Sequence, residues 1–332
     1  MAQARGAYRT LKISQEATYG TKKTSGYIQV PFNENTVGST EDEINPGTIT
    51  GTRYNVEPAY GNISVSGTTT VPLDHRNIGF WLNLLMGGYA KTGTGPYVHT
   101  FTPSTDVPSF SLEEGLTDID HYKQFMGCKV NSMGFRFAQN EELVANIEII
   151  GKEEDTPAGT TIDATPKTYT FNRFNCKEAT LKLGTSPSSL IYTVTDLDVT
   201  VSNNLTADNY TLGEDGFLHD SQATDFSVTG SYTILFDETD GVAAYNAAIA
   251  NTEREAVITL DNGGAGAASR KLEMNIYEFK VGRAPINVSG KGPITLTHTF
   301  SAYYQDNASG RPFDIVLTND INDDYDDGTL EP

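Results

Sequence analysis

The sequence is poor in cysteine and has no long apolar run. Its 332 residues include two cysteines, Cys128 and Cys176, which are too few for a disulfide framework. We expect two unpaired thiols in a reducing compartment, because a chain of this length buries a large core without covalent staples. No stretch reaches the roughly 18 apolar residues of a membrane-spanning helix, and the first residues show no apolar signal segment. Secreted and membrane-spanning classes are therefore not expected.

Basic residues are also scarce. Lysine and arginine number 23 against 43 aspartates and glutamates, which gives a formal net charge of −20. Proteins that clamp nucleic acid neutralise its phosphates with basic side chains, so this balance argues against a general nucleic-acid-binding protein. A surface that repels nucleic acid is compatible with the same charge.

Residues that carry chemistry are few and scattered. None of the five histidines forms a close metal-spaced pair, and the chain has neither a GxSxG nor a GxxxxGK[ST] motif. Asn322, Asp324 and Asp326 have the alternate spacing of a calcium loop, but Asp327 stands where such a loop needs glycine. We therefore predict no enzyme activity, no metal site and no cofactor. His298 lies on the apolar face of a predicted strand and is expected to be buried and hydrogen-bonded.

The sequence is rich instead in residues that favour β-strands. It contains 17 tyrosines and 15 phenylalanines, with many threonines and valines. Apolar and polar residues alternate over residues 63–73, 133–137, 197–201 and 294–300, a period of two that is typical of half-buried strands. We predict a mainly β protein with a barrel or sandwich architecture.

Two segments have helical spacing. Apolar residues recur at helical intervals over 78–85, where Asp74 is the expected N-terminal cap and Gly87 the expected end. The second helix is predicted over 239–249. Both are expected to be short, amphipathic and packed on a sheet. The predicted apolar stripe of the second consists of Val242, Tyr245, Ala248 and Ile249.

A duplication is the strongest organisational signal. ISVSGTTTVPLD at 63–74 resembles FSVTGSYTILFD at 226–237, with the glycine and the final aspartate in register. A helix and three strand-like segments follow each window in the same order. The segments are SFSLEEG, CKVNSMGFRF and LVANIEIIG after the first window, and AVITLDNG, KLEMNIYEF and PITLTHTFSAYY after the second. This order predicts two copies of one β domain.

The domain boundaries follow from composition. A linker rich in proline, threonine and glycine is predicted between the copies. Residues 33–60 hold turn formers and the acidic Glu41–Glu43, and are expected to form a long loop with a short strand near Ile49. The predicted units are an N-terminal segment and arm at 1–59, a first β domain at 60–154, the linker at 155–167, a second β domain at 168–319 and an acidic tail at 320–332.

An ordered set of segments resembles the major tail tube proteins of long-tailed bacteriophages, in their two-part form. The likeness extends from about Glu16 to Asn319, and no single segment is diagnostic. The segments are TYGT, YIQVPFNEN, ITGTRYNVEPAYGNISVSGTTTVPLD, GFWLNLLMG, YVHTFTPSTDVPSFSLEEG, HYKQFMGCKVNSMGFRF, LVANIEIIGKE, FSVTGSYTILFD and GRPFDIVLTN.

The resemblance implies a structural virion protein that assembles into stacked rings. The rings form the tail tube, through which DNA is delivered. The implied partners are other copies of the chain, a tape-measure protein, and the tail terminator and baseplate or tip proteins. DNA passes transiently and no membrane partner is implied. The implied location is the tail, with assembly in the host bacterial cytoplasm.

The duplication adds an expectation about stoichiometry. If a single-domain tube needs six copies in each ring, a duplicated chain supplies the same sheet with three, so we predict trimeric rings with pseudo-sixfold symmetry. Hexameric rings with the second copy outside are the alternative. We also expect an acidic lumen, which would repel DNA phosphates and avoid sticking.

Candidate assembly residues lie in the arm and in the strands. The arm is expected to make ring-to-ring contacts, although an ordinary surface loop is the alternative. The arm candidates are Ile44, Ile49, Arg53, Tyr54 and Tyr60. The barrel-strand candidates are Ile63, Val65, Met133, Phe135, Phe226, Val228, Met274 and Ile276.

A competing function class is a β-sandwich adhesin or carbohydrate-binding module. Such a protein would be expected to have a signal peptide, clustered exposed aromatic residues or calcium ligands, and the sequence shows no clear sign of them.

Overall fold

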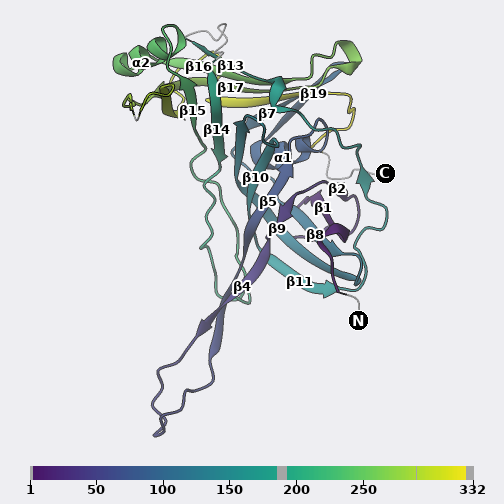
Figure 1. Ribbon diagram of the computed structural model, residues 1–332. Helices are drawn as coiled ribbons and strands as arrows, with labels where there is room; N and C mark the ends of the chain where they lie inside the picture. The colour runs from purple at the N-terminus through teal and green to yellow at the C-terminus, as the bar shows by residue number, and fades with distance from the viewer. Residues whose placement is uncertain (1–2, 185–192, 289, 327–332) are drawn as a thin grey trace.

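Strands are the main regular structure of the chain, in agreement with the alternating patterns. The structure is a computed structural model that describes residues 3–184, 193–288 and 290–326 (Figure 1). Within these residues the strands form one mixed sheet of 19 strands, in which every strand pairing is antiparallel except that of β12 with β2. Two short α-helices, α1 and α2, accompany the sheet. The expectation of a mainly β fold is therefore confirmed.

The elements follow one another along the chain with three short 3-10 helices among them. The strands of the first part are β1 (Arg9–Gln15), β2 (Ile28–Val30), β3 (Glu34–Asn35), β4 (Gly38–Ile44), β5 (Ala59–Pro72), β6 (Gly87–Thr92), β7 (Tyr97–Pro103), β8 (Phe110–Leu116), β9 (His121–Ala138), β10 (Val144–Gly151) and β11 (Glu153–Ala158). Those that follow are β12 (Lys167–Thr168), β13 (Ala179–Gly184), β14 (Val194–Ser202), β15 (Ser227–Leu235), β16 (Arg254–Asp261), β17 (Lys271–Val281), β18 (Thr295–Ala302) and β19 (Phe313–Asn319). The helices are η1 (Gly6–Tyr8), α1 (Ile78–Met86), η2 (Cys176–Glu178), α2 (Asp240–Ala250) and η3 (Gly266–Ala268).

A central run of strands, which we call the central strip, organises the molecule. It consists of β5, β10, β9, β14, β15 and β18, each paired with the next. β9 is 18 residues long, and its first part pairs with β8 and β11 while its second part pairs with β10 and β14. The β9–β14 pairing therefore joins strands from the first and second halves of the chain.

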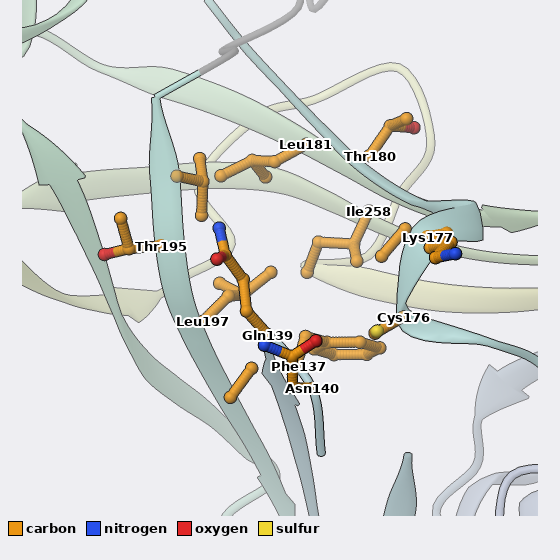
Figure 2. A pocket seen from close by; sticks show the side chains of 13 residues that line it. Phe137, Gln139, Asn140, Cys176, Lys177, Thr180, Leu181, Thr195, Leu197 and Ile258 are labelled. Atoms are coloured by element: carbon orange, nitrogen blue, oxygen red, sulfur yellow. The ribbon is translucent and has the colours of Figure 1, made fainter. Parts of the chain in front are cut away.

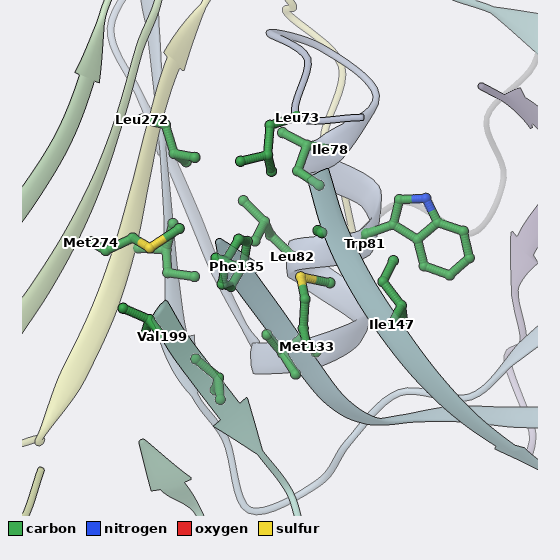
Figure 3. Packing of buried hydrophobic residues seen from close by; sticks show 14 of the residues in the cluster. Leu73, Ile78, Trp81, Leu82, Met133, Phe135, Ile147, Val199, Leu272 and Met274 are labelled. Atoms are coloured by element: carbon green, nitrogen blue, oxygen red, sulfur yellow. The ribbon is translucent and has the colours of Figure 1, made fainter. Parts of the chain in front are cut away.

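One face of the central strip is apolar and buried. A row across the strip places Ala145, Phe135, Val199, Gly230 and Phe300 side by side. These positions continue into one hydrophobic cluster that includes α1 and β17. Figure 3 shows Met133 and Phe135 of β9 packed with residues of α1, β10, β14 and β17. Burial of these side chains is the main stabilising term for the sheet.

Helix α1 lies where its sequence predicts and ends at Gly87, but its N-cap residue is Asn77 and not Asp74. The carboxylate of Asp74 accepts a hydrogen bond from the backbone N–H of Ile78 at 2.9 Å, and Gly87 ends the helix with a positive φ of 76°. The expectation that α1 is amphipathic was wrong, because all nine of its residues are buried. The helix contacts β9 and the hairpin of β6 and β7, so more than one of its faces is covered.

Helix α2 is amphipathic, and of its predicted apolar stripe Ala248 is buried and Tyr245 is half-buried against the core. Its buried residues are Gly241, Ala244, Ala247 and Ala248. Val242 and Ile249, two members of the predicted stripe, are exposed. Small side chains face the sheet because α2 lies close to β15 and β17, and a large side chain has less room there.

The arm and the linker also differ in part from expectation. The segment 33–60 contains β3, the start of β5 and, as its longest strand, β4 at Gly38–Ile44 with the acidic residues, whereas no strand lies at Ile49. Glu41 and Glu43 fit a strand because β4 is exposed along its length and leaves both carboxylates in water. Part of the predicted linker is the strand β11, and the predicted domain boundaries stay a prediction. His298 is buried, and its Nδ1 donates a hydrogen bond to the carbonyl of Gly282 at 3.1 Å, as predicted.

Among the residues that the structure describes, no helix is long and apolar enough to cross a membrane.

Candidate assembly surfaces

The second face of the central strip is polar. Adjacent strands place Thr70, Asn146, Gly134, Thr200, Thr229 and Ser301 in one row across the strip. A parallel row contains Thr68, Glu148, Ser132, Ser202 and Ser227. Because side chains alternate between the faces of a strand, the apolar pattern that buries one face leaves these residues on the other.

Hydrogen bonds between strands order the side chains of this polar face. Thr233 and Thr297 approach each other through their hydroxyl oxygens at 2.8 Å, and Thr70 donates to Asn146 at 2.9 Å. The hydroxyl of Ser132 donates to Glu148 at 2.9 Å. Hydroxyl and amide groups that bond one another leave a hydrophilic surface with few mobile charged chains.

The charges on the polar face are mostly negative. Glu148 of β10 and Asp196 and Asp198 of β14 lie on it, with Arg136 of β9 as a basic residue. The Arg136 guanidinium lies 3.4 Å from the Asp196 carboxylate and 3.6 Å from that of Glu141, so its charge is compensated. Partial burial and the neighbouring Asp196 raise the pKa of Asp198.

Most barrel-strand candidates lie in the core. Six of them belong to the main hydrophobic cluster, whereas Ile63 is half-buried on β5 and Phe226 directly precedes β15. The alternate residues of the same strands, which the sequence patterns mark only as polar partners, form the polar face. The six core residues are Val65, Met133, Phe135, Val228, Met274 and Ile276.

The arm projects from the sheet. Residues 45–58 connect β4 and β5 and extend beyond the rest of the molecule at the lower end of the ribbon (Figure 1). Ile49 is 94% exposed and Tyr54 81% exposed. Arg53 is also exposed, and Ile44 and Tyr60 are exposed at the strand ends that flank the loop. The structure thus brings the five arm candidates together on one protruding hairpin.

A second long connection, 203–226 between β14 and β15, lies against the first half of the chain. The backbone N–H of Ile63 donates to the carbonyl of Gly216 at 2.8 Å. The ammonium groups of Lys129 and Lys152 lie 3.1 and 3.3 Å from the carboxylates of Asp220 and Glu214. Leu205 and Leu218 pack with Ile150 in a small hydrophobic cluster of their own. The sequence patterns gave no indication of this contact.

The two halves of the chain have the same sequence of strand pairings. In the first half the order of neighbours is β1, β8, β9, β10, β5 and β4. In the second half it is β13, β16, β17, β18, β15 and β14. Asp74 and Asp237 each accept a hydrogen bond from the backbone N–H four residues later, at 2.9 Å in both cases.

A cavity of about 460 Å³ lies between the ends of β9, β13 and β14 (Figure 2). Phe137, Leu181 and Leu197 form much of its wall, and its titratable side chains are Cys176 and Lys177. This lining lacks the convergent acids, bases and nucleophiles of an active site. In the described part of the chain, no group of three or more His, Cys, Asp or Glu side chains is positioned to hold a metal ion.

Both cysteines are free thiols in the structure. Cys128 is fully buried and Cys176 is half-buried, and burial raises the pKa of the Cys128 thiol.

The profile of a protein family described as "Phage tail tube protein" matches residues 6–302, the greater part of the chain. No curated protein matches the sequence.

Proposed function

The chain belongs to the phage tail tube protein family, whose members are structural, non-enzymatic components of the tail tube, and from this premise we propose that its copies form closed rings that stack into a DNA-conducting tube. The expectations of a tail tube protein and of a protein that is not an enzyme are confirmed by the family match. The observation that carries the proposed assembly is the central strip, which has one apolar face in the core and one polar face available to a lumen.

The polar face of the central strip lines the lumen in this proposal. Its threonine, serine and asparagine side chains keep water in the channel, and its acids outnumber its bases. A phosphate backbone meets few cationic partners on such a wall, so DNA slides without being held. A map of the electrostatic potential in an assembled tube tests this point, and a net basic lumen would contradict it.

Each chain supplies two copies of one β domain, so that three chains complete a pseudo-sixfold ring. The repeated order of strand pairings and the repeated aspartate hydrogen bonds support this duplication. The proposed copies occupy 60–154 and 168–319, with 155–167 between them. Hexameric rings are the alternative. The acidic tail proposed at 320–332 extends past Asp326 into residues outside the described part.

The arm from Ile44 to Tyr60 makes contacts between stacked rings. Its support is the exposure of Ile49 and Tyr54, since apolar side chains on a protruding loop gain stability when a neighbouring ring covers them. The tape-measure protein, the tail terminator and the baseplate or tip proteins are the further proposed partners, and assembly takes place in the host cytoplasm.

Electron microscopy of the purified full-length chain tests the proposal directly. We expect rings or tubes, and averaged end views should show three repeats of the whole chain with six similar lobes. Dispersed monomers at high concentration would contradict a tube-forming protein. Six repeats of the whole chain would be consistent with a tube-forming protein but would contradict the proposed trimeric ring.

A further inference from the structure

The second part of β9 is paired on both sides within the chain. It lies between β10 and β14, with Val130 opposite Ile149 and Phe135 opposite Val199. Its apolar side chains Met133, Phe135 and Phe137 all point into the core. β9 therefore joins the two halves of the chain into one sheet.

The corresponding stretch of the second half has no strand partner. In the second half Val281 pairs with Phe300, and Phe300 pairs with Gly230. In the first half Val130 pairs with Ile149, and Ile149 pairs with Gly67, the glycine that corresponds to Gly230. Val281 thus takes the place of Val130, and the residues after it take the places of 131–137. In this alignment Ala284, Ile286 and Val288 correspond to Met133, Phe135 and Phe137.

This stretch, Gly282–Val288, has the alternating pattern of a strand but no regular structure. Ile286 is 37% exposed and Val288 is 68% exposed, in contrast to the buried phenylalanines of β9. The neighbouring strand β18 pairs with β15 along most of its length, but among the described pairings it meets β17 only from Phe300 onward. Apart from the hydrogen bond that the backbone N–H of Gly282 donates to the carbonyl of Thr299 at 3.1 Å, one edge of its first residues is therefore open.

A second open edge lies at the other end of the central strip. In the first half β4 pairs with β5, with Ser39 opposite Val65. In the second half β14 pairs with β15, with Val201 opposite Val228, the residue that corresponds to Val65. β4 thus takes the place of β14, whose far edge pairs with β9. In the described pairings β4 pairs with β5 alone, although β11 approaches it and the Ser39 hydroxyl donates to the Glu154 carboxylate of β11. Every residue from Ser39 to Ile44 is exposed.

We propose that Gly282–Val288 forms a β-strand on assembly, between β18 of its own chain and β4 of a second copy. Repetition of the β9–β14 register places Ala284 opposite Ser39 and Arg283 opposite Thr40. This inference rests on the proposed function and names the seam between neighbouring chains. Repeated head to tail, the contact closes a ring.

The charges of the two edges favour this partner. β4 carries Glu41, Asp42 and Glu43 and no base, whereas Arg283 lies in the open segment, which has no acid. Pairing of the two edges thus brings opposite charges together. Pro285 lacks a backbone N–H, so the paired segment has one ladder hydrogen bond fewer at this residue.

Cysteine cross-linking tests the register. In a Cys176→Ser chain, we would pair Ala284→Cys with Ser39→Cys, and separately Arg283→Cys with Thr40→Cys. Two neighbouring pairs are needed because opposed residues alternate between hydrogen-bonded and closer non-hydrogen-bonded positions. The matched control pairs Ala284→Cys with Glu43→Cys, which lies four residues, roughly 13 Å, along the strand. Each single variant is also run.

We expect oxidised tubes of at least one test pair to lose the monomer band on non-reducing gels and to give a covalent ring. The displaced pair and the single variants should keep the monomer band. Tubes that form without a cross-link at either test pair would overturn the inference while the proposed function stands. A parent chain that makes neither rings nor tubes would overturn both.

Hydrogen exchange on the unmodified chain decides the matter if the cysteine variants do not assemble. We expect amides of 282–288 and of β4 to exchange rapidly in the dissociated chain and to become protected in tubes. Unchanged exchange of 282–288 between the two states would overturn the inference.

Discussion

A buried ion pair ties the connection between the two halves to the sheet. The Lys12 ammonium lies 3.1 Å from the Glu113 carboxylate, and it also donates to the carbonyl of Asp163 at 2.8 Å. Glu113 accepts further hydrogen bonds from the backbone N–H of Ile162 at 2.6 Å and from Gln124 at 3.2 Å. The pair fixes the position of the connection more than it stabilises the fold, because the cost of desolvating two buried charges largely offsets their attraction.

Removal of one partner should be far more costly than removal of both. Lys12→Met leaves the Glu113 carboxylate buried without its cation, so we expect a loss of about 3–5 kcal/mol in unfolding free energy. Urea denaturation of the dissociated chain measures it. The double variant Lys12→Met with Glu113→Gln restores neutrality and should recover part of the loss. Equal loss in the single and double variants would contradict this explanation.

Asp74 makes the stability of the folded state decrease as the pH rises. Burial raises its pKa from 3.8 to about 6, so the folded state holds the proton more tightly than the unfolded chain. Its contribution to stability is therefore present at low pH and declines as pH rises from about 4 to about 6, by at most about 3 kcal/mol.

Asp74→Asn should remove this dependence. We expect the wild-type chain to lose stability relative to the variant over pH 4–6, followed by a constant difference above that window. Denaturation of both proteins at several pH values measures the difference in their unfolding free energies. The other titrating groups contribute equally to both proteins, so their effects cancel in this difference. A constant difference over the whole range would rule out a raised pKa for Asp74.

At the level of elements, the packing of β15 against its neighbours depends on glycine. A Cβ atom at Gly230 would overlap the backbone carbonyl oxygen of Asp198 in β14 and would lie 2.6 Å from the ring of Phe300 in β18. At Gly67, the corresponding residue of β5, a Cβ would lie 2.6 Å from the Cα of Val37. At both sites a neighbouring backbone lies too close to leave room for a Cβ atom.

Gly230→Ala should therefore destabilise the chain by about 1–3 kcal/mol, the usual cost of overpacking a core. Gly6→Ala is the matched control, because nothing lies within 4 Å of its added Cβ. Urea denaturation compares the two variants. Equal stabilities would show that β14 and β15 move apart without cost.

Element types were predictable from sequence where periodicity and caps agree. The strands with alternating apolar residues and the C-terminal end of α1 were predicted because Gly87 and the period of two act locally. The burial of α1 on all sides was not predictable, since it depends on the β6–β7 hairpin that covers it. The buried face of α2 was predicted only in part because close packing selected its alanines over its larger residues.

For the whole molecule, the arm should govern stacking without affecting folding. Arg53 is exposed on the projecting hairpin, so Arg53→Glu changes its charge at no cost to the core. We expect this variant to show unchanged denaturation but fewer and shorter tubes in electron micrographs. Arg53→Lys keeps the charge and should assemble normally. Tubes of normal length from Arg53→Glu would show that Arg53 takes no part in the ring-to-ring contact.

The overall arrangement was only partly predictable. Order and spacing of the segments indicated a tail tube protein, and alternation identified core positions such as Met133 and Phe135. The polar face could have been found by reading the residues between them. The packing of 203–226 on the first half could not, because Ile63, Gly216 and Lys152 meet through a long-range contact that leaves no local pattern.

The pairing of β9 with β14 also bears on how assembly starts. These strands belong to one chain, so the connection between them sets their effective concentration, which does not fall when the protein is diluted. Contacts between separate chains have no such tether. Each chain is therefore expected to fold alone at nanomolar dilution, whereas tubes should appear only above a threshold concentration and after a lag that preformed tube ends abolish.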